Sequence, residues 1–205
     1  NLNVPLGFSG KAEISDLRST DFVTPLLQSS GQYTLYLSQP GPGAPNTLDF
    51  NNLESQYNSQ RLTFCSTSNS VALELTFMKN TVPATVRRYV INPPGSPLVQ
   101  GTGMRTASPG GASCPSSTLA GEDFDYNYTL SVADVGSNNV LLFIRLIGSG
   151  SGAKIGVKGV PNLPLPLQGR TITSDAKSDN TGVTKKVLLF QSYPQIPAEF
   201  FVTRF

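Results

Sequence analysis

The sequence predicts an all-β protein: an immunoglobulin-like or jelly-roll-like antiparallel β-sandwich with an N-terminal extension strand. Segments with an apolar residue at every second position recur along the chain, and this period is typical of strands with one buried face. Clusters of Gly, Pro, Asn, Asp and Ser separate these segments, as expected for turns. Only 14% of the 205 residues are charged, and the chain holds 19 glycines and 16 prolines. This composition suits a turn-rich β-protein better than a helical one.

The first predicted strand lies at the N-terminus, in NLNVPLGFSG. Every second residue is apolar, so that one face of an extended segment carries Leu2, Val4, Leu6 and Phe8. Gly7 would allow another backbone to approach closely. That face packs either on the protein's own core or in a groove on another copy. We therefore assign residues 1–10 to an extension and residues 11–205 to a single sandwich domain.

Further segments with strand periodicity follow in order along the chain. They are GQYTLYLSQ (31–39), SVALELTFMK (70–79), ATVRRYVIN (84–92), DYNYTLSVAD (125–134), NVLLFIRLIG (139–148), KIGVKGV (154–160), KKVLLFQSY (185–193) and AEFFVTRF (198–205). Turn-forming segments such as QPGPGAPN, GSGSG and SDNTG lie between them, and GSGSG is interpreted as a hairpin turn. Residues 9–31 fit either one or two helical turns or strand and loop. Residues 92–117 are rich in Gly, Pro and Ser, which predicts a long loop within the domain.

The chain has two cysteines, Cys65 and Cys114. Both lie among Ser, Thr and Pro residues, which indicates loops or strand ends. An even count in a polar chain predicts one disulfide formed in an oxidising compartment; the alternative is two buried thiols. The disulfide would close a loop of roughly 50 residues and stabilise the fold by about 4 kcal/mol.

Several kinds of chemistry have no support in the sequence. The chain contains no histidine, which removes Ser-His-Asp and Cys-His catalysis and histidine-ligated zinc. We therefore expect neither an enzyme nor a cofactor. Basic residues are scattered, and their densest groups are Arg87-Arg88 and Lys185-Lys186, so we expect no nucleic-acid partner. No apolar run is long enough for a membrane span.

The densest acidic stretch is GEDFDYNYT. Asp123, Asp125 and Asn127 have a spacing at which oxygen ligands can converge on Ca²⁺. The glycine and the bidentate glutamate of an EF-hand loop are missing, so the favoured interpretation is the solvated start of a strand, and we expect no metal. Asn127 also opens the sequon Asn-Tyr-Thr, a weak candidate for N-glycosylation.

The two ends of the chain together, NLNVPLGFSG and AEFFVTRF, resemble those of fimbrial subunits that assemble by donor-strand complementation. The closing FVTRF is similar to the last strand of the archaic chaperone–usher group. The resemblance implies an extracellular filament subunit, secreted with its signal or pro-segment already removed. Its N-terminal strand would insert into a neighbouring copy and complete that copy's sheet. The implied partners are further copies in a polymer, with a chaperone or a host surface ligand as additional candidates.

Three other functions fit the same composition. A viral or phage capsid or decoration protein would share the turn-rich, polar jelly roll. A minor type IV pilin-like domain would use AEISDLRSTDF as the end of its helix. A carbohydrate-binding adhesin domain would use surface tyrosines. The sequence alone leaves these alternatives open.

Overall fold

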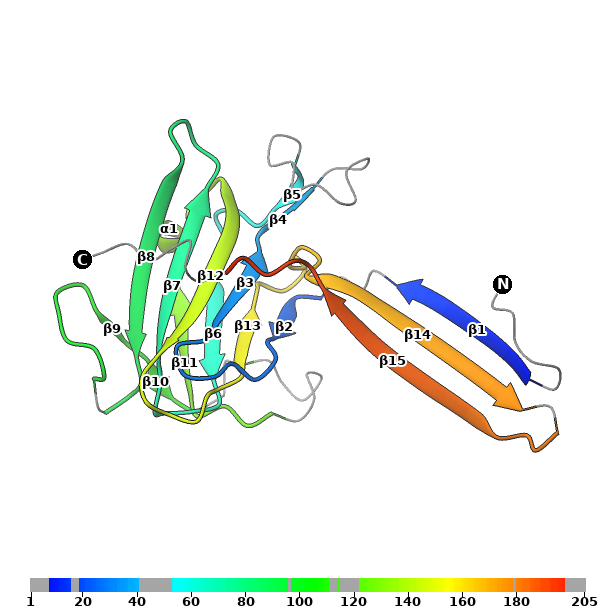
Figure 1. Cartoon of the computed structure of the whole chain (residues 1–205). Coiled ribbons are helices and arrows are strands. Elements are labelled where there is room, and N and C mark those ends of the chain that lie inside the picture. The colour runs from blue at the N-terminus through cyan, green and yellow to red at the C-terminus, as the bar shows by residue number, and fades with distance from the viewer. Residues whose placement is uncertain are drawn as a thin grey trace. The chain divides into compact units, whose positions relative to one another are not determined.

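The computed structural model describes residues 8–15, 19–40, 53–95, 97–110, 114, 122–178 and 180–197 (Figure 1). Almost all regular structure in these ranges is β-strand, which confirms the predicted all-β class. The chain forms two compact units. Residues 1–18 and 167–194 make the first, here called the sheet unit, and residues 19–166 and 195–205 make the second, the jelly-roll unit.

The jelly-roll unit contains two five-stranded sheets. One sheet has, in spatial order, β10 (Ser108–Pro109), β11 (Tyr126–Leu130), β6 (Leu62–Ser66), β13 (Ile155–Lys158) and β2 (Asp21–Val23). The other has β3 (Gln32–Tyr36), β12 (Asn139–Ile147), β7 (Ala72–Lys79), β8 (Thr85–Asn92) and β9 (Arg105–Thr106). Neighbours are antiparallel except for β8 and β9. The unit also includes the pair β4 (Ser38–Pro40) and β5 (Leu53–Gln56), and the helix α1 (Val132–Val135).

The order of pairing decides between the two predicted kinds of sandwich. When the short strands β4, β5, β9 and β10 are set aside, eight strands remain in this unit. The first pairs with the eighth (β2 with β13), the second with the seventh (β3 with β12), the third with the sixth (β6 with β11) and the fourth with the fifth (β7 with β8). This nested pairing arises when one long antiparallel hairpin rolls up into two facing sheets. It is the arrangement of a jelly roll.

The core of this unit lies between its two sheets. Alternate residues of the central strand β7 point inward, and Leu73, Leu75 and Phe77 are fully buried. They pack in one apolar cluster with inward residues of the facing sheet, including Phe64 of β6 and Val157 of β13. The period of two seen in the sequence therefore corresponds to one face on the core.

The sheet unit consists of three antiparallel strands in the order β1-β14-β15. Their bounds are β1 (Phe8–Ser15), β14 (Gly169–Ser178) and β15 (Thr184–Ser192). The boundary expected at residue 10 therefore falls inside a strand, and residues 11–205 do not form one compact unit. The physical reason is that β14 and β15 pair with β1 and with each other rather than with the jelly-roll strands. The helical alternative for residues 9–31 is also wrong, because β1 and β2 are strands.

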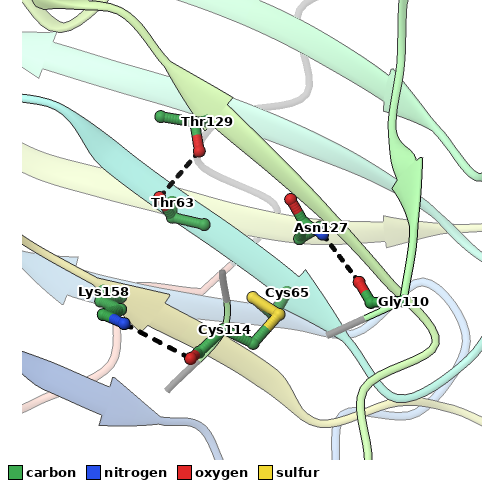
Figure 2. Close-up of a disulfide and its surroundings, with 7 residues drawn as sticks. All are labelled: Thr63, Cys65, Gly110, Cys114, Asn127, Thr129 and Lys158. Atoms are coloured by element: carbon green, nitrogen blue, oxygen red, sulfur yellow. Dashed lines mark hydrogen bonds between the residues drawn. A yellow bond between two sulfur atoms is a disulfide. The ribbon is translucent and has the colours of Figure 1, made fainter. Parts of the chain in front are cut away.

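The predicted disulfide is confirmed (Figure 2). Cys65 and Cys114 are bonded, with their Cα atoms 5.8 Å apart. Cys65 lies one residue before the end of β6 and is fully buried, so the Ser/Thr-rich context concealed a core position. The Nζ of Lys158 on β13 donates to the carbonyl oxygen of Cys114 at 3.5 Å. The disulfide thus attaches Cys114 to the sheet that contains β6 and β13.

Candidate assembly surface

The free edges of the jelly-roll sheets offer little room for an added strand. Three of the four edge strands are very short: β2 has three residues, and β9 and β10 have two each. The fourth edge strand, β3, is capped by Gln195, whose Oε1 accepts from the Thr34 amide at 2.7 Å and whose Nε2 donates to the Thr34 carbonyl at 3.4 Å. Proteins commonly protect sheet edges by short strands or by covering groups. The jelly roll follows that rule.

The sheet unit, in contrast, gathers apolar side chains in the middle rows of one of its faces. Residues directly opposite one another in neighbouring strands point to the same side of a sheet. Ile14 stands opposite Ile172, which stands opposite Leu189; in the next row, Val187 stands opposite Ser174. We call this side the apolar face and define its members as Ala12, Ile14, Ile172, Ala176, Val187 and Leu189. The middle rows of this face are therefore apolar.

The apolar face is open to solvent. Ile14, Val187 and Leu189 have exposed fractions of 64%, 60% and 57%. Residues of the same types in the jelly-roll core are almost completely buried, as Val157 and Ile144 show. Contiguous exposed apolar residues on a soluble protein commonly mark an interaction site.

The opposite face is mixed: it carries most of the charges of the sheet together with the exposed Leu188 and Phe190 of β15, while Lys185 and Arg170 lie at the ends of the apolar face. Lys11, Asp175 and Lys186 stand in one row, with the aspartate between the two lysines. On β1, the Nζ of Lys11 lies 3.3 Å from the Oε2 of Glu13. Because both side chains are largely exposed, this pair adds little stability.

The outer strand β15 differs from the edges of the jelly roll. It has nine residues, all exposed, and occupies one end of the three-stranded sheet. Its centre is the apolar run Val187-Leu188-Leu189-Phe190, and its only charges, Lys185 and Lys186, lie at one end. A long, apolar edge strand is a natural template for pairing with another chain. β15 is thus the least protected edge in the part of the chain that the structure describes.

The residues predicted to form a donor strand fall only partly within the described chain. Leu2, Val4, Leu6 and Gly7 lie outside the described residues. Phe8 is the first residue of β1 and stands opposite Ser178 of β14. Residues 8–15 therefore pair within their own chain, and the insertion of residues 2–8 into a neighbour stays a prediction.

The candidate calcium residues have other partners. Asp125 accepts from the Asn69 amide at 3.1 Å, and the Nδ2 of Asn127 donates to the Gly110 carbonyl at 2.7 Å (Figure 2). The side chain of Asp123 is exposed, while the neighbouring Glu122 pairs with Lys154. No group of three or more Cys, Asp or Glu side chains suited to a metal ion occurs among the described residues. The Asn127 amide, the candidate glycosylation site, is half-buried within β11.

No family model and no curated protein matches the chain. Within the described ranges, no helix combines the length and the apolar character needed to cross a membrane.

A second polar feature, which the sequence analysis missed, surrounds helix α1. The guanidinium of Arg105 donates to both carboxylate oxygens of Asp134, at 2.9 and 2.6 Å. It also lies 4.6 Å from the ring centre of Tyr89, and its Nη1 donates to the hydroxyl of Tyr128 at 3.1 Å. Asp134 in turn forms a capping box with Ser131. This cluster joins β8, β9, β11 and α1 and has a structural role.

The Arg105–Asp134 pair predicts a pH-dependent stability. The hydrogen bonds from Arg105 hold the pKa of the Asp134 carboxyl well below its usual range. A carboxyl whose pKa is lowered on folding stabilises the fold at pH values above its pKa in the unfolded chain, about 4. This stabilisation is lost as the pH falls towards the lowered pKa of the folded state. We expect Asp134→Asn to cost about 2 kcal/mol at pH 7, with a smaller difference from the unmodified protein at pH 3. Urea unfolding of both proteins at pH 7 and pH 3 measures the difference in their unfolding free energies.

A matched control is Asp123→Asn, because Asp123 is exposed. It should change the unfolding free energy at pH 7 by less than about 0.5 kcal/mol. A loss for Asp134→Asn that is equal at both pH values would contradict an ionic origin of the effect.

Proposed function

We propose that this chain is a structural subunit of a closed protein shell and that the apolar face of its sheet unit packs on a neighbouring copy. The observation that carries the proposal is the exposure of Ile14, Val187 and Leu189 in adjacent rows of one face. Fully burying a side chain of this kind contributes about 1.5–3 kcal/mol. Three or more such side chains at each contact, repeated around an assembly, provide a substantial driving force for association.

The jelly-roll fold favours a shell over other kinds of assembly. Jelly rolls occur in viral capsids, lectins and cupins. A cupin-like metal site is disfavoured because the chain has no histidine, and the described residues offer no cluster of metal ligands. The disulfide is compatible with a particle exposed to oxidising surroundings. The step from fold to shell is an analogy, whereas the step from the apolar face to self-association rests on this chain's own residues.

Electron microscopy and light scattering after size exclusion test the proposal on the full chain. We expect particles or their oligomeric fragments for the unmodified protein. The double variant Val187→Asp/Leu189→Asp should shift the mass to that of the monomer, because each contact would have to bury two carboxylates. The control Thr184→Asp adds a charge on the other side of the same strand and should still assemble. A monomeric unmodified protein, or a double variant that assembles normally, would overturn the proposal.

A donor-strand filament is the second candidate. The observation that favours it is a shared alternation in the sequence. The apolar residues Leu2, Val4, Leu6 and Phe8 occupy even positions, as do Ala12 and Ile14 of the apolar face. Deleting residues 1–7 leaves β1 intact and separates the two candidates. Loss of filaments on deletion would favour donor-strand exchange. Assembly that survives the deletion and still depends on Val187 and Leu189 would favour the shell.

A further inference from the structure

The direction of the backbone groups of β15 can be derived from its pairing with β14. The amide of Ser178 donates to the carbonyl of Val183, and the amide of Tyr193 donates to the carbonyl of Gln168. In an antiparallel ladder such hydrogen-bonded pairs alternate with non-hydrogen-bonded pairs. The odd-numbered residues of β15 therefore direct their N–H and C=O groups towards β14. The even-numbered residues, with Leu188 at the centre, direct theirs towards the outer edge.

This alternation restricts how a second β15 can pair at that edge. A ladder needs outward-pointing residues on both strands, so even-numbered residues must stand opposite even-numbered ones. The same parity places the apolar face of one copy beside the apolar face of the other, because residues of one parity share a side. The registers that allow hydrogen bonding between the two β15 strands are thus also the registers that place the two apolar faces on the same side. A two-fold axis normal to the sheet satisfies both.

Among the allowed registers, one uses the whole strand. If Leu188 stands opposite Leu188 of the second copy, then Thr184 stands opposite Ser192, and all nine residues of each strand are paired. Val187 then stands opposite Leu189 on the shared apolar face. Lys185 stands opposite Gln191, so no lysine stands opposite a lysine.

The head-to-tail alternative has a poorer charge pattern. A translated copy would place its β1 beside β15 in the same rows. Lys11 and Lys186 occupy one row of the sheet, on either side of Asp175. The Lys11 of a translated copy would therefore stand next to Lys186 without an intervening acid, and like charges directly opposite destabilise a sheet.

From this geometry we infer that two copies of the chain join at the β15 edge about a two-fold axis through Leu188, which makes one continuous six-stranded sheet. The inference rests on the proposed function, because two copies joined at this edge present one wider apolar face to further copies of the shell. The combined sheet has a continuous apolar row, in which Leu189 of one copy stands between its own Ile172 and Val187 of the other copy. An isologous pair of this kind is the commonest building unit of closed symmetric assemblies.

Cysteine cross-linking of the full chain tests the inference. Both natural cysteines are in the disulfide, so an introduced cysteine is the single free thiol. In the inferred register the Cα atoms of the two 188 positions are about 5.5 Å apart, within the range for a disulfide. The control Thr184→Cys places its thiols about 27 Å apart, since eight residues separate the two positions along the strand. We expect Leu188→Cys to form covalent dimers at least about tenfold faster on mild oxidation.

A double variant checks the register independently. Lys185→Cys/Gln191→Cys places opposite cysteines at two points of the same contact, while the two positions within one strand lie about 20 Å apart. It should also yield a covalent dimer. Equal rates for Leu188→Cys and Thr184→Cys, or cross-linking between positions 11 and 186 in Lys11→Cys/Lys186→Cys, would overturn the two-fold contact. If Leu188→Cys does not cross-link but Val187→Asp/Leu189→Asp still blocks assembly, the edge contact is wrong and the proposed function stands. If neither effect occurs, both are wrong.

Discussion

Replacing Gly152 by alanine is expected to destabilise the jelly-roll unit by about 3–5 kcal/mol, the sum of backbone strain and steric overlap. Gly152 has φ +108°, a conformation that side chains with a Cβ rarely adopt, and a Cβ there would lie 2.3 Å from the carbonyl oxygen of Leu27. The backbone cannot easily move away, because Leu27 and Ala153 exchange two hydrogen bonds of 3.0 and 2.9 Å at this point. Denaturant unfolding of the full chain measures the loss.

The matched control for this prediction is Gly103→Ala. Gly103 also has a positive φ, +81°, but nothing lies within 4 Å of its added Cβ. The control therefore isolates the conformational cost, about 1 kcal/mol for a residue forced into the left-handed region. Equal losses in the two variants would mean that the close approach to Leu27 contributes nothing.

The same glycine explains one error of the sequence analysis. GSGSG was interpreted as a hairpin turn, but β12 and β13 belong to different sheets, so the segment crosses from one sheet to the other. Gly148 and Gly152 are required because backbone carbonyls of Ser70 and Leu27 lie against them. Glycine composition predicts a turn well, but it contains no information about which sheet receives the next strand.

Most strands of the jelly roll could be predicted because one of their faces lies on the core. β7 alternates Leu73, Leu75 and Phe77 with smaller or polar residues, and β12 is a nearly continuous apolar run; the structure buries both strands. β6 was missed although Leu62 and Phe64 alternate, because the Ser/Thr-rich run after Phe64 resembles a loop. Helix α1 was missed because four residues are too few to show a helical period. Its signal was the pair Ser131 and Asp134, three residues apart as in a capping box.

β14 was missed for a different physical reason. Its sequence, GRTITSDAKS, has only one large apolar residue, Ile172. A central strand of a sheet whose faces are both largely open to solvent needs few apolar side chains, so a search for buried alternation does not find it. The β-branched Thr171, Ile172 and Thr173 were the signal that was available.

The candidate assembly surface could not be predicted from any one segment. The apolar alternation in NLNVPLGFSG drew attention to the N-terminus, but the exposed face combines Ile14 of β1 with Val187 and Leu189, more than 150 residues later in the 205-residue chain. Each of these strands alone has the pattern of a half-buried core strand. Only the register of β1, β14 and β15 shows that the three apolar rows coincide on one side. Pairing of strands distant in sequence also decides between a jelly roll and an immunoglobulin-like sandwich, because the alternation along each strand is the same in both.

Removing the disulfide by Cys65→Ala/Cys114→Ala is expected to cost the jelly-roll unit about 4 kcal/mol. The bond spans a sequence separation of 49 residues, and the chain-entropy estimate for a loop of this length gives that value. Because Cys65 and Cys114 are almost completely buried, the two alanines add a small packing loss to the same site. Unfolding in denaturant with and without a reducing agent measures the effect.

This prediction has an internal control in the variant itself. The unmodified protein should lose stability on reduction, whereas the double variant, which has no other cysteine, should be insensitive to the reducing agent. The loss should also be local: Cys114 follows β10 by five residues in the sequence, and β10 pairs with β11 through two residue pairs. Hydrogen exchange at Gly110, whose amide donates to Asp125 at 2.8 Å, should therefore accelerate more than exchange in β7. Reduction that leaves both the unfolding midpoint and the exchange at Gly110 unchanged would show that β10 is held without the disulfide.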